Sequence, residues 1–185
     1  MKISRFALPL CGLWLSAGAQ AFELSSPDIA DGQPLGRAQE FQGFGCDGGN
    51  RAPALAWKDA PQGTRSFAIT VYDPDAPTGS GWWHWVLFNL PADSRSLPAS
   101  AGQTGGAALP AGAVQSLNDY GQTSFGGACP PAGDKPHRYV FTVHALKVPR
   151  LDLDEKAMPA LVGYLLNANS LGKASLTASY ARPAQ

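Results

Sequence analysis

The chain has 185 residues, of which 44% are hydrophobic and 15% charged, and its basic and acidic residues balance at 14 each. This length and composition predict one globular domain that can bury a core of its own. The balanced charge argues against the strongly basic surface that nucleic-acid-binding proteins use, so we expect no nucleic-acid partner.

The first 21 residues have the pattern of a secretory signal peptide. Lys2 and Arg5 form a basic start, Phe6 to Ala17 is an apolar run, and an A-x-A cleavage site ends at Ala21. The apolar run is shorter than the about 20 residues that a membrane-spanning helix needs. We therefore expect residues 1–21 to be removed during export.

Cleavage would leave residues 22–185 as one domain, periplasmic or secreted. Two of the 14 basic residues would be lost and all 14 acidic ones kept, so the mature chain would carry a charge of about −2. No later stretch is apolar for long enough to cross a membrane, so we expect no stable membrane insertion. Lipoprotein processing at Cys11 is the alternative, which the bulky Leu10 before it disfavours.

Cys46 and Cys129 are the two cysteines of the expected mature chain. Both lie in loops rich in glycine and proline, and an oxidising compartment lets a disulfide between them persist. Closing a loop of about 80 residues could contribute roughly 4 kcal/mol in the chain-entropy treatment. We favour this disulfide over the alternative of two free thiols. Neither cysteine has the C-x-x-C spacing of a redox or zinc site.

Most of the domain predicts β-strands. Phe22 to Trp57 reads as short extended segments between turns, without a helical period. Ser66 to Tyr72 alternates apolar and other residues, and by this alternation Asp73 falls on the same face as Phe67. A carboxylate there is unfavourable unless it is hydrogen-bonded or lines a polar pocket.

The next loop combines turn residues with an aromatic cluster. Asp73-Pro-Asp-Ala-Pro77 supplies turn formers, and Gly81-Trp-Trp-His84-Trp follows it. An ordinary turn does not need the aromatic residues, so we interpret Asp73, Asp75 and His84 as parts of a ligand pocket. A structural histidine at a strand end is the alternative for His84. Trp85 to Leu90 is then a continuous apolar strand, as in a sheet buried on both faces.

The second half predicts a loop, a strand, a helix and a last strand. Asp93 to Ala113 is of low complexity with little to bury, which indicates a long surface loop or a mobile flap. Leu153 to Leu171 predicts a helix with acidic residues near its start and a stop at Gly172. Its apolar positions form a core-facing stripe: Met158, Leu161, Val162, Leu165 and Leu166. Ala174 to Tyr180 predicts the last strand.

A second polar cluster precedes the strand that begins near Tyr139. Because His137 has the same alternation as Tyr139, both can face one pocket, whereas His144 lies on the opposite face and is interpreted as structural. Two histidines, charged or as neutral N–H donors, together with loop amides can hold a small anion. Carboxylates beside an imidazole raise its charged fraction. The glycines before Cys129 would let such amides approach a ligand closely.

The two clusters resemble the signatures of the phosphatidylethanolamine-binding protein family. Asp73-Pro-Asp-Ala-Pro77 with Gly81-Trp-Trp-His84-Trp looks like the first, and Gly126-Gly-Ala-Cys129-Pro-Pro131-Ala-Gly133 running into His137-Arg-Tyr-Val-Phe141 looks like the second. The match is closest to the bacterial Raf-kinase-inhibitor-like branch of YbhB/YbcL type and spans nearly all of the mature chain.

This resemblance implies a mostly β fold, a β-sandwich of two antiparallel sheets with one C-terminal helix and few short helices. It also implies a cavity for phosphate-like head groups, formed at matching positions by Asp73, Pro77, Trp83, His84, Gly127, Pro131, His137 and Tyr139. By the same analogy the Ala76–Pro77 bond is expected to be cis. Ser124-Phe125 replaces a usual Gly-Tyr, which removes a hydroxyl expected near the pocket rim.

We therefore predict a binding or regulatory module for a small anionic ligand, without a cofactor or a metal. A metal-assisted hydrolase using His84, His137 and Asp73 is the alternative, which the lack of an H-E-x-x-H or H-x-x-x-H pair disfavours. A serine hydrolase lacks the G-x-S-x-G motif. Family members act as regulators of kinases or proteases rather than as established enzymes, so a protein partner that contacts the pocket rim is a further possibility.

Overall fold

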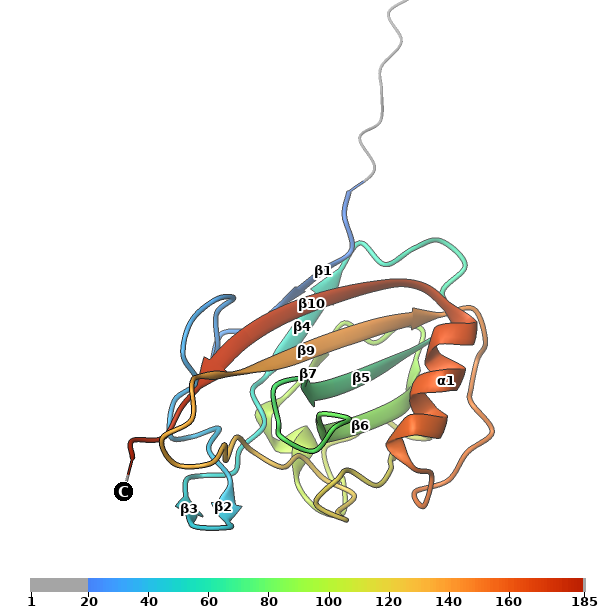
Figure 1. The fold of residues 1–185 in the computed structure, drawn as a ribbon. Coiled ribbons are helices and arrows are strands. Elements are labelled where there is room, and N and C mark those ends of the chain that lie inside the picture. The colour runs from blue at the N-terminus through green and yellow to red at the C-terminus, as the bar shows by residue number, and fades with distance from the viewer. Residues whose placement is uncertain (1–19, 185) are drawn as a thin grey trace, which may run out of the picture.

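The computed structural model describes residues 20–184 and shows a mostly β fold (Figure 1). The first 19 residues of the predicted signal peptide lie outside the described residues. The named strands of this part of the chain form antiparallel ladders in a five-stranded sheet, a three-stranded sheet and a separate hairpin. Within residues 20–184, no helix has the length and apolar character needed to span a bilayer.

The five-stranded sheet has the strand order β10-β9-β5-β6-β8. Its strands are β5 (Ser66–Asp73), β6 (Trp82–Pro91), β8 (Val114–Gln115), β9 (His137–Leu146) and β10 (Ser170–Tyr180). The three-stranded sheet joins β1 (Glu23–Ser25), β4 (Leu55–Lys58) and β7 (Ser96–Leu97). The hairpin consists of β2 (Gln42–Gly43) and β3 (Cys46–Asp47). The strands predicted from the alternation of apolar residues are thus confirmed.

The main core lies between the two larger sheets, as the predicted β-sandwich requires. Phe67 of β5 packs with Trp57 of β4, their ring centroids 5.5 Å apart. On the other face of the five-stranded sheet, a second core lies under helix α1 (Pro159–Asn169). Trp85 faces the first core and Val86 the second, and both are buried. This double burial explains the uninterrupted apolar run of β6.

Helix α1 is shorter than predicted. It starts at Pro159, whose fixed φ suits the first helical position, so the three acidic residues before it lie outside its first turn. Met158 is 67% exposed and Leu161 47% exposed, whereas Val162 and Leu166 are buried. The predicted stripe is therefore only partly correct. The expected stop at Gly172 is wrong, because the helix ends at Asn169 and β10 begins at once.

The segment from Asp93 to Ala113 buries more than its composition indicates. It contains β7 and a short 3₁₀-helix, Ala99–Gly102. Leu97 and Ala101 are fully buried in the main core. The prediction of a surface loop is therefore wrong for the first part of this segment. The alternative that the segment moves as a flap stays a prediction.

Candidate functional site

A cavity of about 180 Å³ opens at one end of the five-stranded sheet. β5 ends at Asp73 where its antiparallel neighbours β6 and β9 begin, so His84 and His137 meet Asp73 at this end. We name Asp73, His84, His137 and Tyr139 the floor. The other lining residues come from turns and loops or from the start of β6: Phe44, Ala76, Pro77, Thr78, Trp82, Tyr120, Cys129, Pro130 and Pro131. Of these we name Phe44, Cys129, Pro130 and Pro131 the rim.

A β-bulge directs His84 into the cavity. The pairing of β6 with β5 shifts by one residue between Trp83 and Trp85, which leaves His84 as an extra residue. Trp83 packs on Tyr72, with ring centroids 4.6 Å apart, next to the core under the helix. The ring of His84 instead lies 5.0 Å from that of Tyr139, on the inner side. Strict alternation from Trp85 would turn His84 outward, so the bulge decides its side of the sheet.

The backbone fixes the tautomer of His84. Its Nδ1 lies 2.8 Å from the carbonyl oxygen of Gly126 and 3.1 Å from that of Gly127. Because carbonyl oxygens only accept, Nδ1 carries the proton of the neutral ring and Nε2 keeps a lone pair. Burial lowers the pKa of His84 to about 4, so the ring is neutral near pH 7. The expectation that His84 donates to an anion is therefore wrong for the neutral ring.

The amides of the glycine-rich loop do not face the cavity either. The N–H of Gly126 donates to the backbone carbonyl of His84 at 2.8 Å. The N–H of Gly127 donates to the side chain of Asn50 at 2.7 Å, and that of Ala128 donates to a backbone carbonyl. The prediction that these amides are free to hold an anion is therefore wrong. These amides attach the loop to its neighbours, and the loop presents two carbonyls to His84 instead.

His137 is held by a buried carboxylate. Its Nδ1 lies 2.8 Å from Oδ2 of Asp73, and the two residues are 2% and 3% exposed. Oδ1 of Asp73 accepts from the backbone N–H groups of Asp75 and Ala76, at 2.8 and 3.1 Å. The inward carboxylate is thus hydrogen-bonded on both oxygens, as its burial requires. Nε2 of His137 lies 3.5 Å from Oδ2 of the half-exposed Asp134.

Six of the nine predicted site residues line the cavity: Asp73, Pro77, His84, Pro131, His137 and Tyr139. Asp75 lies outside it and accepts two hydrogen bonds from the guanidinium of Arg138, at 2.8 and 3.0 Å. These bonds lower the pKa of Asp75 to about 2. Trp83 lies on the other side of the sheet, and Gly127 stands behind His84. The ligand-binding roles of all nine stay predictions.

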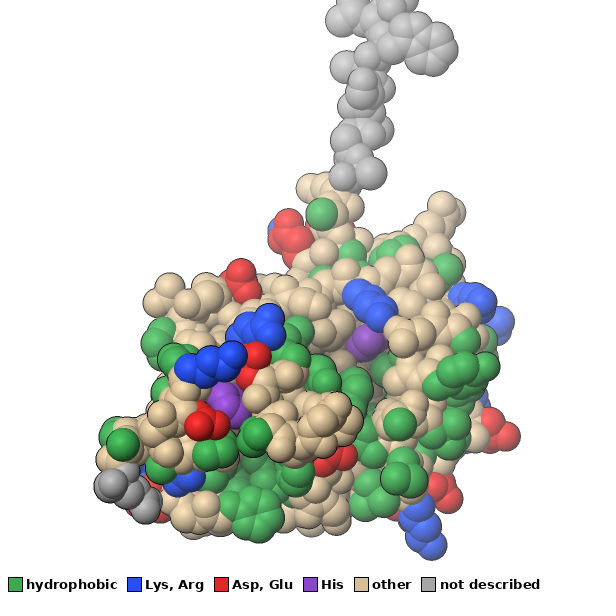
Figure 2. Space-filling model, in the orientation of Figure 1, with side chains coloured by type: hydrophobic (Ala, Val, Ile, Leu, Met, Phe, Trp, Pro, Cys, Tyr) green, Lys and Arg blue, Asp and Glu red, His purple; other side chains and the backbone are tan. Residues whose placement is uncertain are grey.

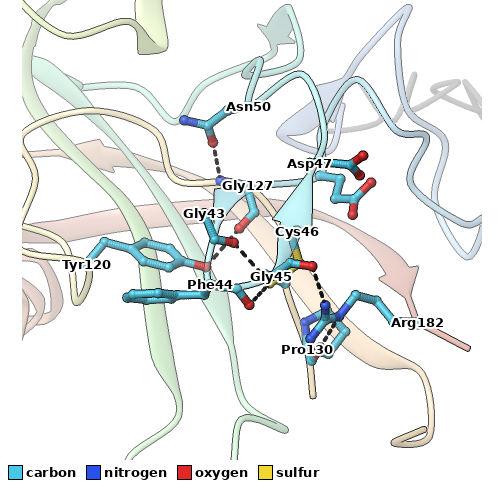
Figure 3. Close-up of a disulfide and its surroundings, with 12 residues drawn as sticks. Gly43, Phe44, Gly45, Cys46, Asp47, Asn50, Tyr120, Gly127, Pro130 and Arg182 are labelled. Carbon is cyan, nitrogen blue, oxygen red and sulfur yellow. Dashed lines mark hydrogen bonds between the residues drawn. A yellow bond between two sulfur atoms is a disulfide. The ribbon is translucent and has the colours of Figure 1, made fainter. Parts of the chain in front are cut away.

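The two segments that carry the rim, the β2–β3 hairpin and the loop around Cys129, are cross-linked to each other. Cys46 and Cys129 form the predicted disulfide, with their Cα atoms 6.0 Å apart and a sequence separation of 83. Figure 3 shows Arg182 beside this bond, where it donates to the carbonyls of Gly45 at 2.9 Å and Pro130 at 2.7 Å. The disulfide and the hydrogen bonds of Arg182 thus connect the same two segments.

Phe44 occupies the turn of this hairpin. Its φ is +52° and that of Gly45 is +79°, so both turn residues are left-handed, as in the tight turns of many hairpins. This backbone is unfavourable for a bulky side chain and often indicates a functional position. The ring is 73% exposed and lies 5.7 Å from that of Tyr120, at the mouth of the cavity.

Trp82 and Tyr120 are lining residues that the sequence did not single out. Their rings pack edge to face at 5.2 Å, and the hydroxyl of Tyr120 donates to the carbonyl of Gly127 at 3.0 Å. Nothing in the sequence separates Trp82 from Trp83, because the bulge that distinguishes them is not encoded in residue type. The turn pattern around Tyr120, just before the glycine-rich loop, was a usable signal.

Three buried polar atoms of the lining have no hydrogen-bond partner within residues 20–184: Nε1 of Trp82, Nε2 of His84 and Oη of Tyr139. Buried polar atoms in proteins are normally paired. An indole N–H only donates, the free nitrogen of neutral His84 only accepts, and a phenol can do either. The residues that line the cavity therefore hold donors and an acceptor that no described residue pairs.

Two expectations drawn from the resemblance fail. The Ala76–Pro77 bond is not cis, since the described residues contain no cis peptide bond. Phe125 is buried in the core against Trp85, with ring centroids 6.0 Å apart, and does not line the cavity. The side chain at position 125 therefore points into the core, and the expectation of a hydroxyl near the pocket rim at this position is wrong.

The metal-site alternative finds no geometric support. Within residues 20–184, no three His, Cys, Asp or Glu side chains are grouped so that they could hold a metal ion. Asp73 in particular uses both oxygens for protein hydrogen bonds.

Comparisons with known proteins extend over the whole domain. The family profile described as phosphatidylethanolamine-binding protein matches residues 25–181. The chain is 52% identical over 180 residues to UPF0098 protein YbcL of Escherichia coli K12, which covers 97% of this chain and 98% of YbcL. It is also 52% identical over 158 residues to UPF0098 protein YbhB of that strain, covering 85% of this chain and 99% of YbhB.

Solved structures show the same similarity. The crystal structure of E. coli YbcL, described as a new member of the mammalian PEBP family, matches with a TM-score of 0.85 at 54% identity and covers 86% of this chain and 98% of that chain. The PEBP homologue CT736 from Chlamydia trachomatis matches with a TM-score of 0.72 at 28% identity, covering 88% of this chain and 98% of that one. The predicted family and fold are confirmed.

Proposed function

The chain belongs to the phosphatidylethanolamine-binding protein family, and we propose that its cavity binds the phosphate-like group of a small anionic ligand. The unpartnered polar atoms of Trp82, His84 and Tyr139 in one cavity carry this proposal. A polar group that enters the cavity would satisfy all three, which is the expected state of buried polar atoms.

The dimensions of the cavity limit the ligand. Its volume of about 180 Å³ is below the roughly 300–1,000 Å³ of sites for drug-sized molecules. A head group fits such a space, while the rest of a larger ligand would extend past Phe44 at the mouth. A protein partner, such as a kinase or protease, would meet a bound ligand at this rim. Figure 2 shows charges of both signs spread over one face of the molecule, without a broad basic patch.

Calorimetric titration of the mature domain with phosphate and with O-phosphorylethanolamine tests the proposal. We expect weak binding that a chelator does not change and that is tighter near pH 6 than near pH 8. His84→Ala and His137→Ala should each abolish it, because each removes a floor residue.

His144→Ala is the matched control. His144 is also buried, but it bonds to Thr70 at 3.0 Å, away from the cavity lining. This variant should bind as the unaltered protein does. Absence of binding for both ligands at both pH values would overturn the proposal, and binding that a chelator removes would favour the metal-site alternative.

We also propose that the protein is exported and works in the periplasm or outside the cell. The signal-peptide pattern and the Cys46–Cys129 disulfide support this, since disulfides persist in oxidising compartments. The YbcL match, over 180 of 185 residues, extends into the predicted signal peptide. N-terminal sequencing of the protein from fractionated cells should find Phe22 first. An intact Met1 on a cytosolic protein would contradict export.

A further inference from the structure

We propose that the outer face of helix α1 is a contact surface for a second copy of this chain. The second copy packs its own α1 against this face in antiparallel orientation, around a two-fold axis near Tyr164. The inference does not depend on what the cavity binds. The exposed apolar face of the helix and the opposite charges at its two ends carry it.

The solvent-facing side of α1 is apolar. Within residues 20–184, five large hydrophobic side chains are exposed, and four of them lie on or beside this helix: Met158, Leu161, Tyr164 and Leu171. The sequence of α1 contains no charged residue, so no charge of its own interrupts this face. Surface helices of globular proteins normally carry charged and polar residues on the side away from the core. An exposed apolar face of this kind indicates a protein contact.

Tyr164 lies at the centre of the exposed face. Val162 and Leu166 are buried in the core under the helix. Ala160, Tyr164 and Ala168 follow one another at intervals of four residues, and all three are exposed. In an antiparallel pair centred on Tyr164, Ala160 of one copy therefore lies opposite Ala168 of the other. Small side chains on both sides of the tyrosine let the two helices approach closely.

The charges at the two ends of α1 have opposite signs. Three exposed acidic residues precede the helix: Asp152, Asp154 and Glu155. At the other end, Nζ of Lys173 donates to Oδ1 of Asn167 at 2.7 Å. The backbone N–H of Lys147 donates to the carbonyl of Asn169 at 3.0 Å. Two exposed lysines thus lie beside the last turn of the helix.

These charges favour the antiparallel orientation. Arg150 lies 4.0 Å from Asp152 in an ion pair, and Lys156 is also near the acidic end, but two basic residues do not balance three acidic ones. Antiparallel packing brings the acidic end of each copy to the lysine end of the other, whereas parallel packing would join like charges. An anionic bilayer suits this face less well, because interfacial helices carry lysine or arginine on their polar face and α1 carries neither.

The contact is small, and it leaves the cavity free. With 11 residues, α1 is roughly 16 Å long, so a pair of these helices lies at the low end of interface sizes and a micromolar dissociation constant is expected. No lining residue among those described comes from α1. Figure 1 shows this helix and the β2–β3 hairpin on opposite sides of the molecule. The dimer therefore presents two cavities.

Sedimentation velocity of the mature domain tests the inference at concentrations from about 5 to 500 μM, which bracket a micromolar dissociation constant. We expect a monomer–dimer equilibrium. Tyr164→Lys brings two lysines together at the axis and should weaken the dimer at least about 100-fold. Its unfolding midpoint should not change, because Tyr164 is 70% exposed. Phe44→Lys is the matched control: Phe44 is 73% exposed but lies on the hairpin, so this variant should dimerise as the unaltered protein does.

Cysteine cross-linking tests the orientation. Tyr164→Cys should form a disulfide-linked dimer, because a residue on a two-fold axis meets its own copy. Ala168→Cys should link to Ala160→Cys in a mixture but not to itself.

Three results would overturn the inference: a domain that stays monomeric at the highest concentration, a Tyr164→Lys variant that dimerises normally, and self-linkage of Ala168→Cys. A monomeric domain that sediments with vesicles of phosphatidylglycerol and phosphatidylcholine would also overturn it and assign the face to a membrane surface.

Discussion

The floor and the rim of the cavity are built in different ways. Floor residues stand on three adjacent strands and are at most 3% exposed. Hydrogen bonds between β5 and β9 fix Asp73 and His137, and a bond from β6 to the glycine-rich loop fixes His84. The rim consists of loops and one turn, held by the disulfide and by Arg182, with Phe44 73% exposed. The sheet therefore fixes the polar groups of the floor, whereas the cross-links hold the opening of the cavity.

Removal of the disulfide tests the rim most strongly. The double variant Cys46→Ser/Cys129→Ser should lower the free energy of unfolding by roughly 4 kcal/mol, because the bond closes a loop with a sequence separation of 83. Denaturant unfolding measures this loss. Ligand binding by the folded variant should weaken far less than in a floor variant. Complete loss of binding would show that rim and floor are not separable.

His137→Ala tests the floor. It leaves Asp73 buried with one partner fewer, so the free energy of unfolding should fall by roughly 3 kcal/mol, and ligand binding should be lost with it. Unfolding curves and calorimetric titration give the two quantities. His144→Ala, away from the cavity, should retain binding at any temperature where it is folded. Full stability of His137→Ala would contradict the role of the Asp73–His137 pair.

The pH dependence of stability is a third test, to which His84 of the floor contributes. The pKa of His84 is about 4 in the folded protein and near 6.5 when unfolded, so the unfolded state binds the proton first. Stability should therefore decrease as the pH falls below about 6.5, by about 2 kcal/mol at pH 5 from this residue. His144, with a pKa lowered by burial to about 3, acts in the same direction.

Unfolding measurements at pH 7 and pH 5 check this dependence. His84→Gln should lose less stability over that range than the unaltered protein, because glutamine does not titrate. An identical loss in both proteins would assign the acid sensitivity to groups outside the floor.

Phe44→Asn should have the smallest effect, and in opposite directions on stability and binding. Asparagine tolerates a positive φ better than phenylalanine, so the free energy of unfolding should rise by about 1 kcal/mol. Loss of the exposed ring at the mouth should weaken ligand binding several-fold. Thermal unfolding and calorimetry measure both. A variant that is less stable would show that the ring stabilises the turn by packing on Tyr120.

Residue alternation was enough to predict much of the fold and part of the floor. The parity of Asp73 with Phe67, and of His137 with Tyr139, placed all four on the inner face, where they lie. Cysteine count and compartment were enough to predict the disulfide. These features follow from the two-residue alternation of strands and from composition, and both can be read directly from the sequence.

Residue types alone did not predict which hydrogen-bond donors and acceptors face the cavity. Glycines near Cys129 predicted free amides, but hydrogen bonds to distant segments occupy those amides and leave carbonyls facing His84. Asp75 resembles a site residue by spacing, yet Arg138 holds it outside the lining. Partners of this kind are set by tertiary contacts between residues far apart in the chain.

The bulge at His84 makes the site depend on the number of residues in β6 as well as on their identity. Deletion of His84 itself would remove the bulge and the imidazole together. An insertion nearby could displace it while every family signature residue was retained. A homologue can therefore keep the whole motif and lose the function through one change in length, which identity scores would barely register.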